Sequence, residues 1–466
     1  MPRKQSRTQR KVEFLTAAEA MYERLEDWYD AHPDASFEEI EDELRRQRRG
    51  LLGQTLATLI VGRDSGFDVE SPKCPQCGRP REFEDYRPWT VRGLEGDCTL
   101  ERAYYTCSAC AGQGFSPLDQ KLQLRRDHWS AGAARVATRL GLQAKSFDLA
   151  AEAFGDAVGR RMSADSLAGI TEDWGRRIGI QRTTEAAQAN LPAQRDERPD
   201  QRRVVEVQAI SGQANLSTDG AMMLVRSEGW KEVKIVAVSE VQVKPAEVRQ
   251  STQPGHRTGD PLVELSQHSY QAGLWDADTM AQYQYAEGLR RGLDRCRKLS
   301  SVNDGALWIK RITTTNFSHA KQIVDWRHAS DHLWAVANAV CGDHTPEARQ
   351  WTEGQLDLLW DGQVAQVVTT LDSLDLQRER WPDLVREAPD YCRSNQPRMR
   401  YDVFREQGLP IGSGTVENAA NTVVHHRLKR PGRGWSRDNG QAMLAALSEL
   451  HSGRFNQAWQ QTFSRS

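Results

Sequence analysis

The sequence lacks any run of 18 or more apolar residues, and its positively charged start, MPRKQSRTQRK, lacks the apolar segment of a signal peptide. It has no excess of one charge, because 62 Lys and Arg residues stand against 64 Asp and Glu residues. A GxxxxGK[ST] loop for nucleotide phosphates is also absent. We therefore expect no membrane span, a cytoplasmic location and a reaction that needs no ATP.

Cysteine is scarce, with eight residues in 466, which argues against the disulfide scaffold of a small secreted protein. Four of them form two closely spaced pairs, Cys74 with Cys77 and Cys107 with Cys110. Two such pairs supply the four thiolates that structural zinc prefers. The alternating stretch VRGLEGDCTLERAYYTC favours a β-hairpin between them. Residues 71–118 are therefore predicted to be a zinc ribbon, with a redox pair or a chance spacing as alternatives.

The sequence on either side of the ribbon predicts helices. Residues 1–70 form an N-terminal helical region, in which Pro33 ends one helix and Ser36 caps the next. Residues 119–190 contain three short segments that each open with serine and continue with small residues. They fit a helix-turn-helix (HTH-like) DNA-binding region or, equally well, a plain helical bundle. A polar, proline-containing segment predicts a domain boundary near 190–203.

The second half of the chain predicts a mixed sheet. Residues 204–329 follow the order β-β-β-α-β-α-β, which is typical of an RNase H-like core. Residues 330–409 are almost wholly helical and are expected to be an all-helical insertion. Residues 410–466 return to the core with a glycine-flanked turn and a basic helix. The whole chain is thus predicted to be a multidomain α+β protein.

Three acidic residues are expected to meet at one edge of this sheet. Asp219 lies on the first, central strand, Asp304 ends the fourth strand beside it, and Glu417 opens the helix after IGSG. Hard cations prefer oxygen ligands, and phosphodiester transfer uses two Mg²⁺ ions about 3.5–4 Å apart. Each Asp-Gly pair alone is also a common turn. Asp325, which follows the fifth strand, is the alternative to Asp304.

A basic run, HHRLKRPGRGWSR, follows the helix that carries Glu417. Such runs are often solvated faces, but beside a metal site they can neutralise DNA phosphates. The residues expected to bind DNA in this way are Arg427, Lys429, Arg430, Arg433 and Arg437. Trp435 is expected to pack, with stacking on an extruded base as the alternative.

Long blocks of the chain resemble the DDE transposases of bacterial insertion sequences, specifically the ISKra-type family. The blocks are CPQCGRP, RAYYTCSACAGQGFSPLD, STDGAMM, VNDGALWIK, AKQIVDWRHASDHLW, RMRYDVFREQGLPIGSGTVENAANTVVHHRLKRPGRGWS and GQAMLAALSELHSGRF. The resemblance implies an RNase H-like core with the catalytic triad Asp219, Asp304 and Glu417, which would hold a Mg²⁺ or Mn²⁺ pair. Asp325 and His328 would be a supporting element, although a structural histidine is the simpler reading of His328.

This resemblance also implies an activity and partners. The chain would cleave double-stranded DNA at the terminal inverted repeats of its element and join the 3′-hydroxyl to target DNA. It would act as a homo-oligomer on DNA at the bacterial nucleoid, with structural Zn²⁺ in the ribbon and base reading by the N-terminal half. Two alternatives stay open: a non-catalytic zinc-containing regulator derived from a transposase, and an RNase H-like nuclease without strand transfer.

Overall fold

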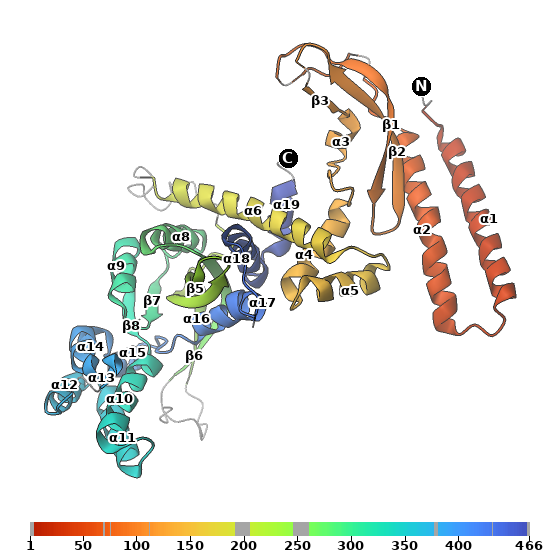
Figure 1. The fold of residues 1–466 in the computed structure, drawn as a ribbon. Coiled ribbons are helices and arrows are strands. Elements are labelled where there is room, and N and C mark those ends of the chain that lie inside the picture. The colour runs from red at the N-terminus through yellow and green to blue at the C-terminus, as the bar shows by residue number, and fades with distance from the viewer. Residues whose placement is uncertain are drawn as a thin grey trace. The chain divides into compact units, whose positions relative to one another are not determined.

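The computed structural model describes residues 4–68, 70–74, 76–110, 112–191, 206–245, 261–376, 381–430 and 432–463. It is a mixed α+β fold (Figure 1). One compact unit contains Met1–Thr171 with Trp459–Ser466, and the other contains Glu172–Ala458. The division falls inside the long helix α6 (Ala164–Ala189), so residues 119–190 are shared between the units. Most of the boundary predicted near 190–203 lies outside the described residues.

Two 25-residue helices open the first unit as a hairpin, α1 (Arg7–Ala31) and α2 (Phe37–Val61). Each begins with a capping box: the hydroxyl of Ser6 or Ser36 accepts the backbone N–H of Gln9 or Glu39, and the backbone N–H of the serine donates to the side chain of that same residue. The predicted cap at Ser36 is confirmed. Neither helix, nor any other in the described part of the chain, has the length and apolar character needed to cross a membrane.

A three-stranded antiparallel sheet follows, formed by β1 (Glu82–Arg92), β2 (Asp97–Cys107) and β3 (Gly112–Phe115). Helix α2 packs on β2 at Gly53. A Cβ atom at Gly53 would lie 2.1 Å from the carbonyl oxygen of Asp97, so only glycine permits this approach.

Short helices then complete the first unit. They are α3 (Pro117–Lys121), α4 (Ala131–Gln143), α5 (Phe147–Val158) and the start of α6. Ser130 and Ser146 cap α4 and α5, as their position in the sequence predicts. The third helix differs from expectation, because α6 runs for 26 residues instead of ending after a few turns.

The second unit is built on a five-stranded sheet with the order β6-β5-β4-β7-β8. The strands are β4 (Gln213–Val225), β5 (Gly229–Lys244), β6 (Leu262–Gly273), β7 (Lys298–Asn303) and β8 (Lys321–Val324). The first three pair in antiparallel fashion, whereas β7 and β8 run parallel to β4. The first strand therefore lies at the centre with the fourth beside it, as the sequence predicts.

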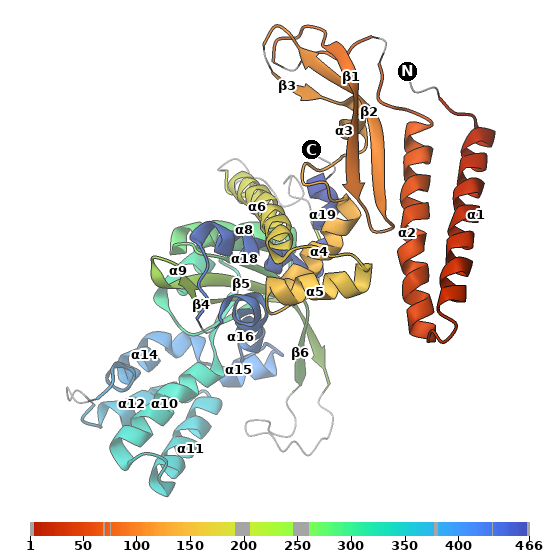
Figure 2. The ribbon, with the colours of Figure 1, turned by 45° about the vertical axis from the view of Figure 1, so that its right-hand side comes forward.

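Helices cover both faces of this sheet (Figure 2). On one face Leu216 packs in a cluster with Met280 and Phe317, from α8 (Ala277–Arg290) and the end of α9 (Leu307–Asn316). On the other face Met223 meets Gly440 of α18. The helices near β4 on this second face are α16 (Gly414–Ala419), the π-helix η3 (Ala420–His425) and α18 (Arg437–His451).

An all-helical segment follows β8 and ends before α16, close to the predicted insertion. It contains α10 (Trp326–Cys341), α11 (Pro346–Trp360), α12 (Val364–Asp372), α13 (Asp383–Arg386), α14 (Ala388–Asn395), η2 (Gln396–Arg398) and α15 (Tyr401–Glu406). These helices share a core with β7 and β8, in which Leu333, Phe404 and Val324 are fully buried. Because the core is shared, the insertion is anchored to the parallel edge of the sheet.

A buried ionic cluster joins α6, α8 and α18. Arg454 donates to Glu287 at 2.8 Å and to Glu449 at 3.0 Å, and both acids are almost completely buried. Arg182 and Arg290 complete the cluster through Glu449 and Glu287 respectively. These arginines hold the pKa of both carboxyl groups below its usual range despite burial, which raises it, so the acids stay ionised.

Candidate active site and metal centre

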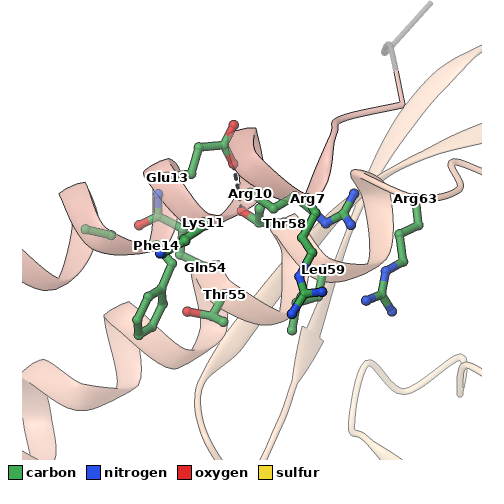
Figure 3. Close-up of a pocket in the computed structure, with 11 residues that line it drawn as sticks. Arg7, Arg10, Lys11, Glu13, Phe14, Gln54, Thr55, Thr58, Leu59 and Arg63 are labelled. Atoms are coloured by element: carbon green, nitrogen blue, oxygen red, sulfur yellow. Dashed lines mark hydrogen bonds between the residues drawn. The ribbon is translucent and has the colours of Figure 1, made fainter.

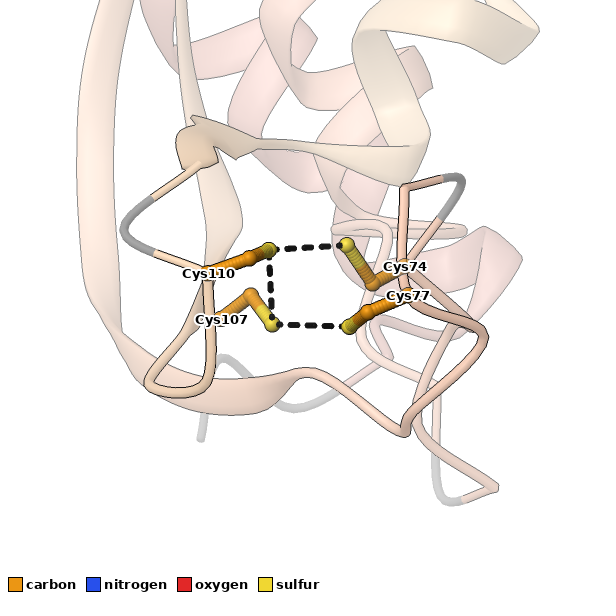
Figure 4. A group of neighbouring side chains, drawn as sticks. All are labelled: Cys74, Cys77, Cys107 and Cys110. Atoms are coloured by element: carbon orange, nitrogen blue, oxygen red, sulfur yellow. Dashed lines mark hydrogen bonds between the residues drawn. The ribbon is translucent and has the colours of Figure 1, made fainter.

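Four cysteines gather at the end of the three-stranded sheet (Figure 4). Their sulfur atoms all lie within 4.8 Å of one another, and the Cys74–Cys110, Cys77–Cys107 and Cys107–Cys110 pairs are 3.5, 3.6 and 3.4 Å apart. A tetrahedral Zn–S distance of about 2.3 Å corresponds to sulfur separations of about 3.8 Å. The four thiols can therefore hold a metal ion such as zinc, as their spacing predicts.

Local backbone geometry prepares these thiols to bind as thiolates. N–H groups of Cys77 and Gln76 point at the Cys74 sulfur and lower its pKa to about 6. The neighbouring Cys110 thiol and the N–H of Ala109 likewise lower the pKa of Cys107. A metal competes with protons for sulfur, so a lowered thiol pKa favours its binding.

Asp219, on β4, and Asp304, directly after β7, each follow a residue that links the two neighbouring strands. β4 and β7 pair in parallel over Gln213–Asn215 and Lys298–Ser300, and the contact between Thr218 and Asn303 keeps the same separation of 85 residues along the chain. The Asn303 side-chain oxygen accepts the N–H of Thr218 at 2.7 Å. This bond ties the two strands together immediately before the two acids.

Glu417 lies on the helix that covers the same face as Asp219. Side chains four residues apart on a strand share a face, so Asp219 faces the same way as Met223, which meets α18. Helix α16, which carries Glu417 in its first turn, packs against β4 and β5. The charges of Asp304 and Glu417 both act on Asp219, so the three carboxylates lie within electrostatic reach of one another.

The three acids lie near one another but not in direct ligand contact. Among the described residues, the cysteine group alone has three or more ligand atoms within 4.8 Å of one another. Burial raises the pKa of Asp219, and the charges of Asp304 and Glu417 raise it further, against the Gly220 N–H and His328, which lower it. Bringing the acids together thus carries a repulsion that a cation would relieve.

Each of these carboxylates keeps one oxygen without a hydrogen bond in the described part of the chain. One oxygen of Asp219 accepts the N–H of Gly220, and one oxygen of Asp304 accepts the N–H of Ala306. One oxygen of Glu417 lies 3.3 Å from the Arg327 guanidinium. The remaining oxygens are available to a ligand.

Asp325 has a different environment. It is 1% exposed, and its two oxygens accept the backbone N–H groups of His328 and Ser413. The N–H of Trp326 also donates to the carbonyl of Ile411 at 2.9 Å. Asp325 therefore caps α10 and holds the loop that leads into α16, which is a positioning role.

The histidines of α10 have separate surroundings. His328 lies close enough to lower the pKa of Asp219 by its charge. His332 stacks on Tyr391 with ring centroids 3.9 Å apart, and burial lowers its pKa. The Tyr391 hydroxyl donates to the backbone carbonyl of Asp304 at 2.7 Å. The insertion thus holds the loop that carries Asp304.

The predicted DNA-binding residues differ in their accessibility. Lys429 and Arg433 are exposed, Arg430 is half-buried, and Arg437 is exposed but forms an ion pair with Glu228. Arg427 is 5% exposed and lies over the Trp435 ring, and burial lowers its pKa to about 10. The prediction that Arg427 contacts DNA is therefore corrected, since its side chain is enclosed by the protein.

Sequence reasoning missed three residues that shape this site. Asn303 and Arg327 adjoin recognised positions in VNDG and DWRH, but only the strand register and the position of α16 reveal their contacts. Tyr391 lies in the insertion, with no local sequence signal.

A scan of protein-family models and a search of curated proteins each return no match to the chain.

Proposed function

We propose that the chain is a DNA transposase of a bacterial insertion sequence, with an RNase H-like core. In this proposal Asp219, Asp304 and Glu417 hold a pair of Mg²⁺ or Mn²⁺ ions. The observation that supports the proposal is the hydrogen bond between Thr218 and Asn303, which joins the residues directly before Asp219 and Asp304, while the charges of Asp304 and Glu417 both act on Asp219. The sheet order and the resemblance of the surrounding sequence blocks add support.

The free carboxylate oxygens suit hard cations, which prefer oxygen ligands. When bound, the ions would activate the attacking oxygen and stabilise the leaving oxygen of a phosphodiester. The protein's own residues hold the three carboxylates in position. Asn303 fixes the two strands, Asp325 fixes the entry to α16, and Arg327 offsets the charge of Glu417 until a ligand arrives.

DNA would be the partner on both sides of the reaction. Lys429 and Arg433, exposed and close in sequence to Glu417, are suited to neutralising backbone phosphates without reading bases. The cysteine group would hold structural Zn²⁺ in a ribbon that, with the HTH-like helices α4 to α6, engages terminal inverted repeats. Joining two transposon ends to one target DNA requires at least a dimer on DNA. In this proposal the protein acts at the bacterial nucleoid.

The proposal is tested with duplexes that carry the ends of the DNA flanking the gene. The full chain is incubated with labelled duplex, target DNA and Mg²⁺, and products are separated on denaturing gels. We expect nicked ends followed by joined products. Asp219→Asn, Asp304→Asn and Glu417→Gln should each lower product formation at least about 10²-fold while leaving DNA binding nearly intact.

Asp331→Asn is the matched control, because Asp331 is an exposed acid on α10. It should retain full activity. Binding without any cleavage would favour the regulator, and nicks without joining would favour the nuclease. Full activity in any one of the three variants would remove that residue from the site.

A further inference from the structure

A groove of about 420 Å³ runs between α1 and α2 in the N-terminal hairpin (Figure 3). We call it the hairpin groove. Its lining residues are Arg7, Arg10, Lys11, Glu13, Phe14, Ala17, Gln54, Thr55, Thr58, Leu59 and Arg63. Four of these side chains are cationic and one is acidic, so the lining carries net positive charge although the whole chain has a net charge of −2.

The charges of the groove are unbalanced within the protein. In the described part of the chain, Arg7, Lys11 and Arg63 form no ion pair with an acid. Arg10 directs its guanidinium to the backbone carbonyls of Gln5 and Gly62. The single acid, Glu13, accepts hydrogen bonds from Thr58 and from Gln5 instead.

Elsewhere in the first unit arginine is commonly paired. The pairs are Arg46–Glu43, Arg48–Glu95, Arg87–Asp85, Arg102–Asp119, Arg125–Asp127 and Arg160–Asp97. Four cations that line one groove with a single carboxylate repel one another, and an anion bound between them would reduce that repulsion.

We propose that the hairpin groove binds phosphate groups of a nucleic-acid backbone. Arginine forks match phosphate oxygens in geometry, and lysine adds a compact charge. Arg7 and Lys11 lie one helical turn apart on α1, and Arg63 lies directly after the C-terminus of α2, so the cations span more than one phosphate ion would need. Phe14 and Leu59, 39% and 40% exposed, provide apolar surface that suits a sugar.

This inference goes beyond the proposed chemistry, because it uses no carboxylate of the larger sheet and no metal. It assigns the N-terminal hairpin a backbone-holding role that does not depend on base sequence. The same phosphate chemistry could come from free phosphate or a nucleotide, which the experiment distinguishes.

The test uses the full chain with Arg7→Gln, Lys11→Gln and Arg63→Gln combined. Its control combines Arg24→Gln and Arg45→Gln, residues of the same two helices outside the groove, of which Arg24 is exposed and Arg45 is half-buried. Binding to a labelled duplex is followed by fluorescence anisotropy without divalent ions, from about 50 to 200 mM salt. Each lost phosphate contact reduces the slope of log K against log salt by about 0.9.

We expect the triple variant to lose about 2–3 units of slope and at least about tenfold in affinity at the lowest salt. The control variant should keep most of the wild-type slope and affinity. Circular dichroism should show the same helix content in the wild type, the triple variant and the control. An unchanged slope in the triple variant would overturn the inference, as would a wild type that binds no duplex. Competition by inorganic phosphate or ATP at concentrations similar to DNA phosphate would also overturn it. Loss of strand transfer in a separate assay would not affect it.

Discussion

Replacing Asp219 with asparagine should make the metal-free protein more stable. Burial and the charges of Asp304 and Glu417 raise the pKa of Asp219, so its ionised form is disfavoured in the fold. Asparagine is uncharged and its side-chain oxygen can still accept the N–H of Gly220. The substitution therefore removes the repulsion and keeps the hydrogen bond.

The size of the effect follows from the spacing of the charges. Two unit charges 4 Å apart repel by about 4 kcal/mol at an effective dielectric constant of about 20. The oxygens of the three acids do not all lie within 4.8 Å, and Arg327 offsets part of the charge on Glu417. We therefore expect a gain of about 1–2 kcal/mol in the free energy of unfolding, or about 2–6 °C in Tm.

The sign of the pH dependence is fixed by the raised pKa. A folded state that holds the Asp219 proton more tightly than the unfolded chain loses stability as pH rises from about 4, the pKa of an unfolded aspartate, through the folded pKa. The gain in the free energy of unfolding from Asp219→Asn should thus be near zero at the acid end of that range. It should reach its full value above the folded pKa of Asp219.

Differential scanning calorimetry at several pH values, with and without Mg²⁺, measures both effects. Mg²⁺ at 100 times its Kd should stabilise the wild type by about 2.7 kcal/mol and the variant by much less, so the order of the two Tm values should reverse. Asp331→Asn, at an exposed position, should unfold at the same temperature as the wild type both without and with Mg²⁺. A variant that unfolds below the wild type in metal-free buffer at pH 7 would refute the proposed repulsion.

Two further predictions concern the first unit. Cys107→Ser should lose the bound metal, measured as zinc per chain by plasma mass spectrometry, whereas Cys98→Ser, at a buried cysteine outside the group, should keep it; equal zinc in both would contradict the four-thiol site. Gly53→Ala should lower the free energy of unfolding by at least about 2 kcal/mol, because its Cβ would collide with Asp97. Gly50→Ala, on the same helix with open space around it, should raise it by up to about 1 kcal/mol, so urea unfolding of the two variants should move in opposite directions.

Local signals in the sequence predicted the elements that depend on neighbouring residues. Ser36, Ser130 and Ser146 cap helices because a serine hydroxyl satisfies the exposed N–H groups of the first turn. The paired cysteines predicted their own cluster, since four thiols at that spacing have few other uses. The strand order followed from the alternation of strands and helices.

Features that depend on distant contacts were not predictable in this way. In the sequence, Arg427 is one of a row of basic residues, yet it is 5% exposed and its guanidinium lies over the Trp435 ring. Asp325 resembles Asp304 in sequence, since each follows a strand. Their roles separate only because the loop at Ser413 returns to donate to Asp325, a contact 88 residues away along the chain.

The ionic cluster around Arg454 sets an order of events for the growing chain. Glu287 is synthesised 167 residues before Arg454, the cation that lies against it in the finished fold. A carboxylate without its partner is costly to enclose. Arg290 on α8 itself already pairs with Glu287, whereas Arg454 follows α18, so the cluster is complete only when the end of the second unit has been synthesised. A stop codon shortly before Arg454 would leave Glu287 with Arg290 as its remaining arginine partner and should lower the stability of the second unit.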